Sequence, residues 1–237
     1  MAEIICDGKT VRDINAEIKR LIAQGEIDIL VKNPGARHNL GVAILQPVHI
    51  TFDNSVGYYC AGMSDSPTVE ISGSAGWGLA ESMMSGTVII HGSAGNGAAA
   101  SIRGGTVVIH DDAAARLGVS MKGGLILVAG NCGYMAGFMA QKGTLIVCGD
   151  VGEAFADSMY EAVCFVGGNI AGLGNDAVIE TLAAEDLVFL ESTLSRYLPS
   201  EIRKSQAEIN RHFKKVIAGR RLWNFDKDER AVWREVL

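Results

Sequence analysis

Short hydrophobic runs alternate with turn-forming residues at a fixed interval along most of the chain. The runs read TVEI, TVII, TVVI, LILV, TLIV and VCFV, and they begin at Thr68, Thr87, Thr106, Leu125, Thr144 and Val163. Each run is rich in β-branched residues and is bounded by turn residues, which is typical of a strand. Successive runs begin nineteen residues apart, so we predict a short strand at the same place in every repeat.

Turn formers follow the same nineteen-residue period, for example in the column Asn54, Gly73, Gly92, Asp111, Gly130, Gly149 and Gly168. A repeat this short has no room for a crossover helix between parallel strands, so the repeats must stack as coils of a parallel β-solenoid. Glycine suits corners where one backbone lies close to the next, and a valine at Gly97 is expected to be worse than most surface changes. Residues 111–114 (Asp-Asp-Ala-Ala) replace the usual Gly-x-x-Gly, and a differently shaped corner is expected there.

Alternation along each strand separates an inner face from an outer face. The inward positions are the pairs Val69/Ile71, Val88/Ile90, Val107/Ile109, Ile126/Val128, Leu145/Val147 and Cys164/Val166, which we expect to form the core. Five adjacent outward positions are also apolar, namely Ile89, Val108, Leu127, Ile146 and Phe165. An apolar stripe of this length needs a cover, which is either the chain's own C-terminal helix or another subunit.

Helical periodicity is found on both sides of the repeats. Before them, a helix is expected from about Thr10 to the stop at Gly25, followed by a strand in residues 26–33. After them, residues 183–199 and 199–219 predict two helices that are separated at Pro199.

The end of the chain predicts one more short helix, over residues 228–237. Three aromatic residues near it, Trp223, Phe225 and Trp233, either fold back onto the solenoid or dock on another chain. We therefore divide the chain into an N-terminal helix–strand cap (residues 1–34), the solenoid (residues 35–175) and a C-terminal helical extension (residues 176–237).

Composition narrows the function classes. The 237 residues carry a formal net charge of -6, and the pI is near 5.4, so the chain lacks the basic character expected for binding nucleic acid or an anionic membrane. Neither a leader peptide nor an apolar run of membrane-spanning length is recognisable, and a cytoplasmic protein is expected. The five cysteines, Cys6, Cys60, Cys132, Cys148 and Cys164, contain no C-x-x-C pair and suit reduced thiols.

His91 and His110 are candidate metal or catalytic residues, because they occupy the same register in adjacent repeats. A zinc site needs three or four converging ligands, whereas Ser72 and Ala129 are the next members of that column. The GSAGWG and GSAGNG segments lead into further coils rather than into a helix, which disfavours a dinucleotide site. No hydrolase, metalloprotease or P-loop motif is present, so we expect no catalytic, cofactor-binding or metal-ligating residue in this chain.

The repeated corners GSAGWG and GSAGNG resemble those of the GXGXG domain, the right-handed parallel β-helix at the C-terminal end of the glutamate synthase large subunit. The resemblance covers roughly residues 30–175 and implies a right-handed, mainly β solenoid of about seven coils. The chain length, the segment NPGARHNLGV and the tail RRLWNFDKDERAVWREVL look most like the free-standing β-helix subunit of N-methylglutamate synthase.

This resemblance implies a structural subunit rather than a catalytic one. The expected partners are an amidotransferase-like subunit and an FMN-binding, glutamate-synthase-like subunit that also holds an iron–sulfur cluster, together forming a higher hetero-oligomer. The complex would convert methylamine and glutamate to N-methylglutamate and ammonia.

Two alternatives remain open at this point. The chain could be the scaffold of a different complex, either another glutamate synthase relative or formylmethanofuran dehydrogenase, whose C subunit contains a similar module. It could also be an autonomous β-helix enzyme such as an acyltransferase, although the hexapeptide coils of those enzymes do not fit a period of nineteen.

Overall fold

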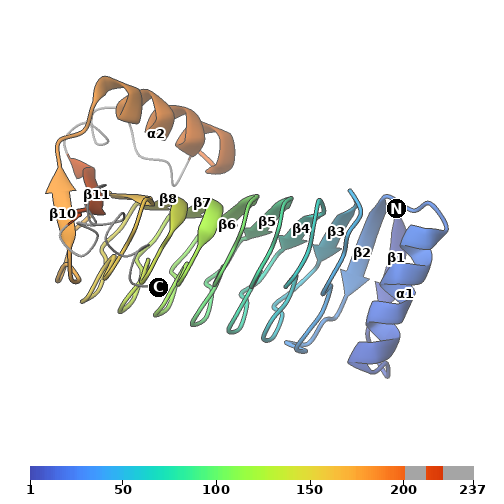
Figure 1. The fold of residues 1–237 in the computed structure, drawn as a ribbon. Coiled ribbons are helices and arrows are strands. Elements are labelled where there is room, and N and C mark those ends of the chain that lie inside the picture. The colour runs from blue at the N-terminus through green and yellow to red at the C-terminus, as the bar shows by residue number, and fades with distance from the viewer. Residues whose placement is uncertain (201–211, 221–237) are drawn as a thin grey trace, which may run out of the picture.

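The computed structural model describes residues 1–200 and 212–220, which wind into a β-solenoid with one helix at its N-terminal end and another along its side (Figure 1). The parallel strands are β1 (Ala2–Ile5), β2 (Asp28–Lys32), β3 (His49–Phe52), β4 (Thr68–Ile71), β5 (Thr87–Ile90), β6 (Thr106–Ile109), β7 (Lys122–Val128), β8 (Lys142–Val147) and β9 (Val163–Val166). The other elements are α1 (Val11–Ala23), β10 (Ala177–Glu180), α2 (Ala184–Tyr197) and β11 (Lys214–Ala218).

Each strand from β1 to β9 pairs in parallel with its neighbours in sequence, and most partners from β3 onward are nineteen residues apart. A second line of parallel bridges runs along another side of the coils, through Val56, Ala75, Ala94, Ala113, Cys132, Val151 and Ile170. The predicted mainly β, parallel solenoid is therefore confirmed.

Side-chain hydrogen bonds at one corner link successive coils. The Ser55 hydroxyl accepts a hydrogen bond from the Ser74 backbone N–H at 3.0 Å. Farther along, Asp112 Oδ1 accepts one from the Asn131 N–H at 2.7 Å, and Asp150 does the same for Asn169. The parallel bridges continue through Ala113, so residues 111–114 keep the winding of the other coils. The expected difference at this corner lies in its side-chain contact with the preceding coil, where the Ser93 hydroxyl donates to Asp111 Oδ2 at 2.7 Å.

The inward positions form one continuous core. All twelve side chains of the predicted inward pairs are fully buried, from Val69 in β4 to Val166 in β9. Aliphatic residues of β1, β2 and α1 extend this core past the first coil. Burial of a complete aliphatic side chain contributes about 1.5–3 kcal/mol, so these stacked columns are the main stabilising feature of the solenoid.

The N-terminal end is closed by a β1–α1–β2 unit. Helix α1 begins where Thr10 Oγ1 accepts the Asp13 N–H at 3.2 Å while the Asp13 carboxylate accepts the Thr10 N–H. The predicted helix and the strand after it are confirmed. Strand β1, which pairs in parallel with β2, was not predicted.

The C-terminal end is closed by two antiparallel strands. Helix α2 lies where the first C-terminal helix was predicted, but the expected helix across residues 199–219 is wrong over β11. Strand β11 lies between β9 and β10 and is antiparallel to both. The Lys215 ammonium joins these elements, because it forms ion pairs with Glu180 of β10 at 3.3 Å and Asp186 of α2 at 3.1 Å.

Several expectations concern residues that the structure does not describe. Trp223, Phe225 and Trp233, the helix expected over residues 228–237, and residues 201–211 of the second C-terminal helix all lie outside the described ranges. Neither α1 nor α2, the two described helices, is long and apolar enough to cross a lipid bilayer.

Candidate interaction surfaces

The apolar stripe on the outer face is covered mainly by the chain itself. Val108, Leu127, Ile146 and Phe165 are at most 3% exposed, and they pack in one cluster with residues of α2 and the segment before β11. The buried side chains contributed by these covering segments are Leu190, Leu194, Leu198 and Phe213. Of the two covers considered from the sequence, the C-terminal helix is therefore the correct one for this half of the face, which needs no other subunit.

The other half of the outer face carries a diagonal row of acids and histidines. His49 on β3 lies 3.4 Å from Asp28 on β2 and 3.6 Å from the Glu70 carboxylate on β4. His91 Nε2 lies 2.6 Å from the second Glu70 oxygen, and this hydrogen bond is the main cause that lowers the Glu70 pKa. We call Asp28, His49, Glu70, His91 and His110 the acid–histidine row.

The row ends at helix α2. The rings of His91 and His110 meet edge to face with their centroids 4.9 Å apart, so the predicted adjacency is confirmed. His110 Nε2 donates a hydrogen bond to the Tyr197 carbonyl at 3.2 Å, where α2 leaves its last carbonyls without helical partners. The two histidines therefore make different contacts, because His91 binds a carboxylate and His110 binds the end of a helix.

The row lacks the convergence that metal binding needs. His49 and His91 approach opposite oxygens of Glu70, and within residues 1–200 and 212–220 no group of three potential ligands is arranged around one point. Sequence reasoning missed His49 and Glu70. The available signal was Glu70 itself, the only charged residue in a column that is apolar from Ile89 onward.

Acidification is expected to loosen the C-terminal end of α2. Burial is the main cause that lowers the pKa of His110, and the nearby His91 lowers it further. The unfolded chain therefore binds more protons than the folded state just below the ordinary histidine pKa of about 6.5. The stabilisation from neutral His110 is complete above that pH and is lost as the pH falls through the lower folded pKa. Hydrogen exchange at the Leu198 amide, which donates to Leu194, measures this loosening.

A His110→Gln variant is the control, because glutamine retains a donor for the Tyr197 carbonyl and does not titrate. Its exchange rate at Leu198, corrected for the intrinsic rate, should vary much less between pH 5 and pH 8 than that of the unmodified protein. An equal pH dependence in the two proteins would show that His110 is not the responsible group.

The cysteines are placed for packing rather than chemistry. All five, Cys6, Cys60, Cys132, Cys148 and Cys164, are buried. Burial raises the pKa of Cys60 to about 12 and that of Cys132 to about 12, so neither thiol forms the reactive thiolate at neutral pH.

A stack of exposed rings follows one corner of the first coils. His38 and Tyr58 stack with centroids 4.3 Å apart, and Tyr58 and Trp77 stack at 5.2 Å. Glycines make room for the rings, because a Cβ at Gly76 would lie 2.4 Å from the Tyr58 ring and one at Gly95 would lie 2.8 Å from Trp77. Tyr58 is 38% exposed and Trp77 is 51% exposed, and we call His38, Tyr58 and Trp77 the aromatic corner.

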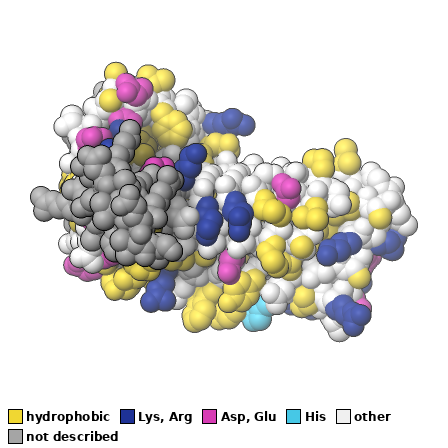
Figure 2. All heavy atoms as spheres, viewed as in Figure 1, with side chains coloured by type: hydrophobic (Ala, Val, Ile, Leu, Met, Phe, Trp, Pro, Cys, Tyr) yellow, Lys and Arg dark blue, Asp and Glu magenta, His cyan; other side chains and the backbone are white. Residues whose placement is uncertain are grey.

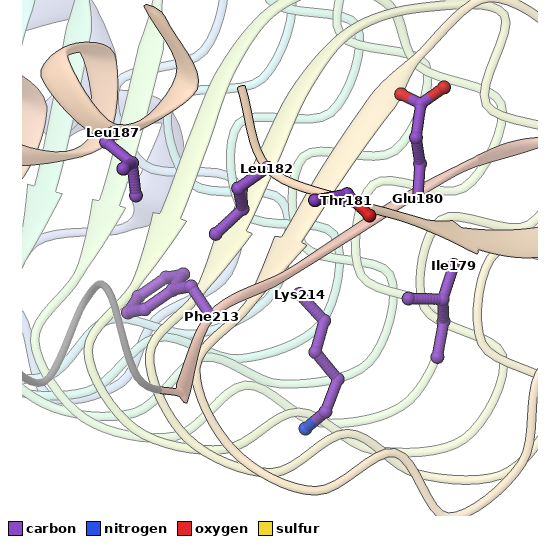
Figure 3. A pocket seen from close by; sticks show the side chains of 7 residues that line it. All are labelled: Ile179, Glu180, Thr181, Leu182, Leu187, Phe213 and Lys214. Atoms are coloured by element: carbon purple, nitrogen blue, oxygen red, sulfur yellow. The ribbon is translucent and has the colours of Figure 1, made fainter. Parts of the chain in front are cut away.

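A cavity of about 400 Å³ lies at the C-terminal end, between β10, the start of α2 and β11 (Figure 3). Its lining residues are Ile179, Glu180, Thr181, Leu182, Leu187, Phe213 and Lys214. The charged groups there already have protein partners, since Lys214 donates to the Gly168 carbonyl at 2.8 Å and Glu180 pairs with Lys215. The lining therefore offers no set of free polar groups converging on a substrate.

Fold and surfaces together define a class: a parallel β-solenoid whose described residues offer contact surfaces rather than a convergent catalytic set. The chain matches the family described as GXGXG motif over residues 37–234, and it belongs to this family. It is also 50% identical over 220 residues to Protein GlxC of Rhizobium meliloti (strain 1021), covering 92% of this chain and 93% of the relative. The resemblance to the GXGXG domain inferred from the corner sequences is therefore confirmed.

Proposed function

We propose that this chain is a non-catalytic structural subunit of a multisubunit, glutamate-synthase-like flavoenzyme, and specifically of N-methylglutamate synthase. Its partners are an amidotransferase-like subunit and a synthase-like subunit that holds FMN and an iron–sulfur cluster. Membership of the GXGXG family and the likeness of the termini to the free-standing β-helix subunit support this assignment. The complex then converts methylamine and glutamate to N-methylglutamate and ammonia.

The aromatic corner is the observation that carries the proposal. Large rings that remain half exposed are enriched at the centres of protein interfaces, because they bury much area and lose little conformational entropy on binding. Trp77 and Tyr58 are already held in place by stacking, so docking a partner requires little further ordering. Other exposed apolar side chains on the same early coils include Leu45, Met63 and Met84.

The proposal is tested by co-expressing this chain with an amidotransferase-like subunit and an FMN-binding, synthase-like subunit from the same organism. We expect the subunits to co-purify and the complex to form N-methylglutamate from methylamine and glutamate. A Tyr58→Ser/Trp77→Ser double variant should lose at least about tenfold in affinity for the partners, since truncating a tyrosine or tryptophan at an interface hot spot costs about 2 kcal/mol or more. Size-exclusion chromatography and isothermal titration measure assembly and affinity.

Tyr134→Ser is the matched control. Tyr134 belongs to the same nineteen-residue column as Tyr58 and Trp77 and is 49% exposed, but it lies three coils beyond Trp77. This variant should assemble normally. If the unmodified chain instead stayed a monomer that never associated with a flavoprotein, or if it catalysed a reaction alone, the proposed function would be wrong.

A further inference from the structure

Three successive coils each carry a cation followed by glycine, at the first residue of a strand in β7 and β8 and three residues before the strand in β6. The segments are Arg103-Gly104-Gly105, Lys122-Gly123-Gly124 and Lys142-Gly143. The equivalent positions of the two preceding coils are Met84 and Asp65, and the following coil carries Glu161, so the cations are confined to the middle of the solenoid. We call Arg103, Lys122 and Lys142 the basic row.

The winding brings these cations side by side. Lys122 and Lys142 are directly paired across β7 and β8, at a register shift that lengthens both strands. Arg103 occupies the preceding coil, whose Ile102 carbonyl accepts the Lys122 N–H at 2.7 Å. Adjacent coils are about 4.8 Å apart, so three like charges follow one another at strand spacing. Like charges directly opposite each other repel and are unfavourable in a sheet.

None of the three cations forms an ion pair or a side-chain hydrogen bond within the described residues. Other lysines in those residues do have carboxylate partners, such as Lys32 with Glu3 at 2.9 Å and Lys215 with Asp186. Within the part of the chain that the structure describes, the basic row therefore has no carboxylate partner, although the chain carries a net charge of -6. Figure 2 shows Lys and Arg side chains lying side by side over the middle coils.

The glycines beside the cations leave the row open. A Cβ at Gly104 would lie 2.5 Å from the Met84 carbonyl oxygen, and one at Gly123 would lie 2.3 Å from that of Arg103. The coils therefore require bare backbone here, and no side chain from these positions can shield or neutralise the cations. The basic row is therefore flanked by bare backbone on successive coils.

We propose that the basic row binds the carboxylates of an extended, acidic segment of a partner protein. Phosphate sites gather backbone N–H groups and cations around one point. Here the N–H groups of Arg103 and Lys122 already donate to carbonyls of the preceding coil, and the cations stand in single file. Carboxylates spread along a peptide match such a row, and their charge complements it. The inference does not depend on which enzyme complex the chain joins.

The test measures binding of a labelled synthetic peptide of alternating glutamate and serine to the full chain by fluorescence anisotropy. We expect binding at about 50 mM NaCl that weakens roughly tenfold at about 300 mM, because screening is strong for exposed charges. The peptide with glutamine in place of glutamate should not bind. An Arg103→Gln/Lys122→Gln variant should weaken binding of the glutamate peptide at least about fivefold.

An Arg12→Gln/Lys19→Gln variant is the matched control, because it removes one arginine and one lysine from the exposed face of α1. Equal weakening by both double variants would show that only net charge matters, and would overturn the proposal. Stronger binding of inorganic tripolyphosphate than of the peptide would also overturn it in favour of a phosphate site. If amide substitution of Asp226, Asp228 and Glu229 raised peptide affinity severalfold, the occupant would be this chain's own carboxylates rather than a partner.

Discussion

Replacing Gly86 with alanine is expected to destabilise the protein by about 3 kcal/mol. Gly86 has a φ of +98°, in the region that L side chains rarely adopt, and its Cβ would lie 2.2 Å from the Pro67 carbonyl oxygen of the preceding coil. That carbonyl also accepts the Thr87 N–H at 2.9 Å, so it cannot move without weakening the pairing of β4 with β5. The midpoint of urea unfolding, followed by circular dichroism, measures the loss.

Gly97→Ala separates backbone strain from steric contact. Gly97 also has positive φ, at +68°, but nothing lies within 4 Å of its ideal Cβ. The same column holds Tyr59, Arg116, Met135 and Ala154 at similar φ values, so this corner accepts a side chain. We expect a loss of about 1 kcal/mol. Equal losses at Gly86 and Gly97 would contradict the steric explanation.

The comparison of these two glycines also shows what the repeat could and could not predict. The nineteen-residue period locates the corners, and it led to the expectation that a side chain at Gly97 would be poorly tolerated. The period does not reveal whether a Cβ would point toward the neighbouring coil or into solvent. That direction depends on the backbone path of two coils together, which explains why Gly86, and not Gly97, is the crowded position.

Strand β11 was beyond prediction for a different reason. The segment from Pro199 to Gly219 has helical periodicity, and Val216 and Ile217 are a weak strand signal by themselves. The strand exists because it pairs with β9 on one side and with β10 on the other. Such pairing between distant segments overrides local preference and leaves no trace in a short sequence window.

The acid–histidine row escaped detection because it crosses the columns diagonally. His49, Glu70 and His91 occupy three different columns of the repeat, on β3, on β4 and directly after β5. Examining one column at a time compares His91 only with Ser72 and His110. Long side chains on adjacent strands also reach diagonal neighbours, so the contacts depend on side-chain length as well as on register.

Replacing Leu194 with alanine is expected to weaken the docking of α2 by about 2–5 kcal/mol. Leu194 is fully buried in the cluster that covers Leu127 and Ile146. Each coil of a solenoid contacts mainly its own neighbours, so the loss should appear as local opening of α2 rather than as unfolding of the coils. Hydrogen exchange should therefore accelerate in residues 184–198 and remain slow in β3 to β6.

Val188→Ala provides the control on the same helix, because Val188 is 66% exposed and lies outside this cluster. Its exchange pattern should match that of the unmodified protein. In Leu194→Ala, the uncovered stripe should also bind a hydrophobic dye, since exposed apolar patches of this kind attract apolar ligands. If the stripe stayed protected after α2 opened, something other than α2 would cover it. If β3 to β6 opened together with α2, the helix would stabilise the whole solenoid rather than close one half of its outer face.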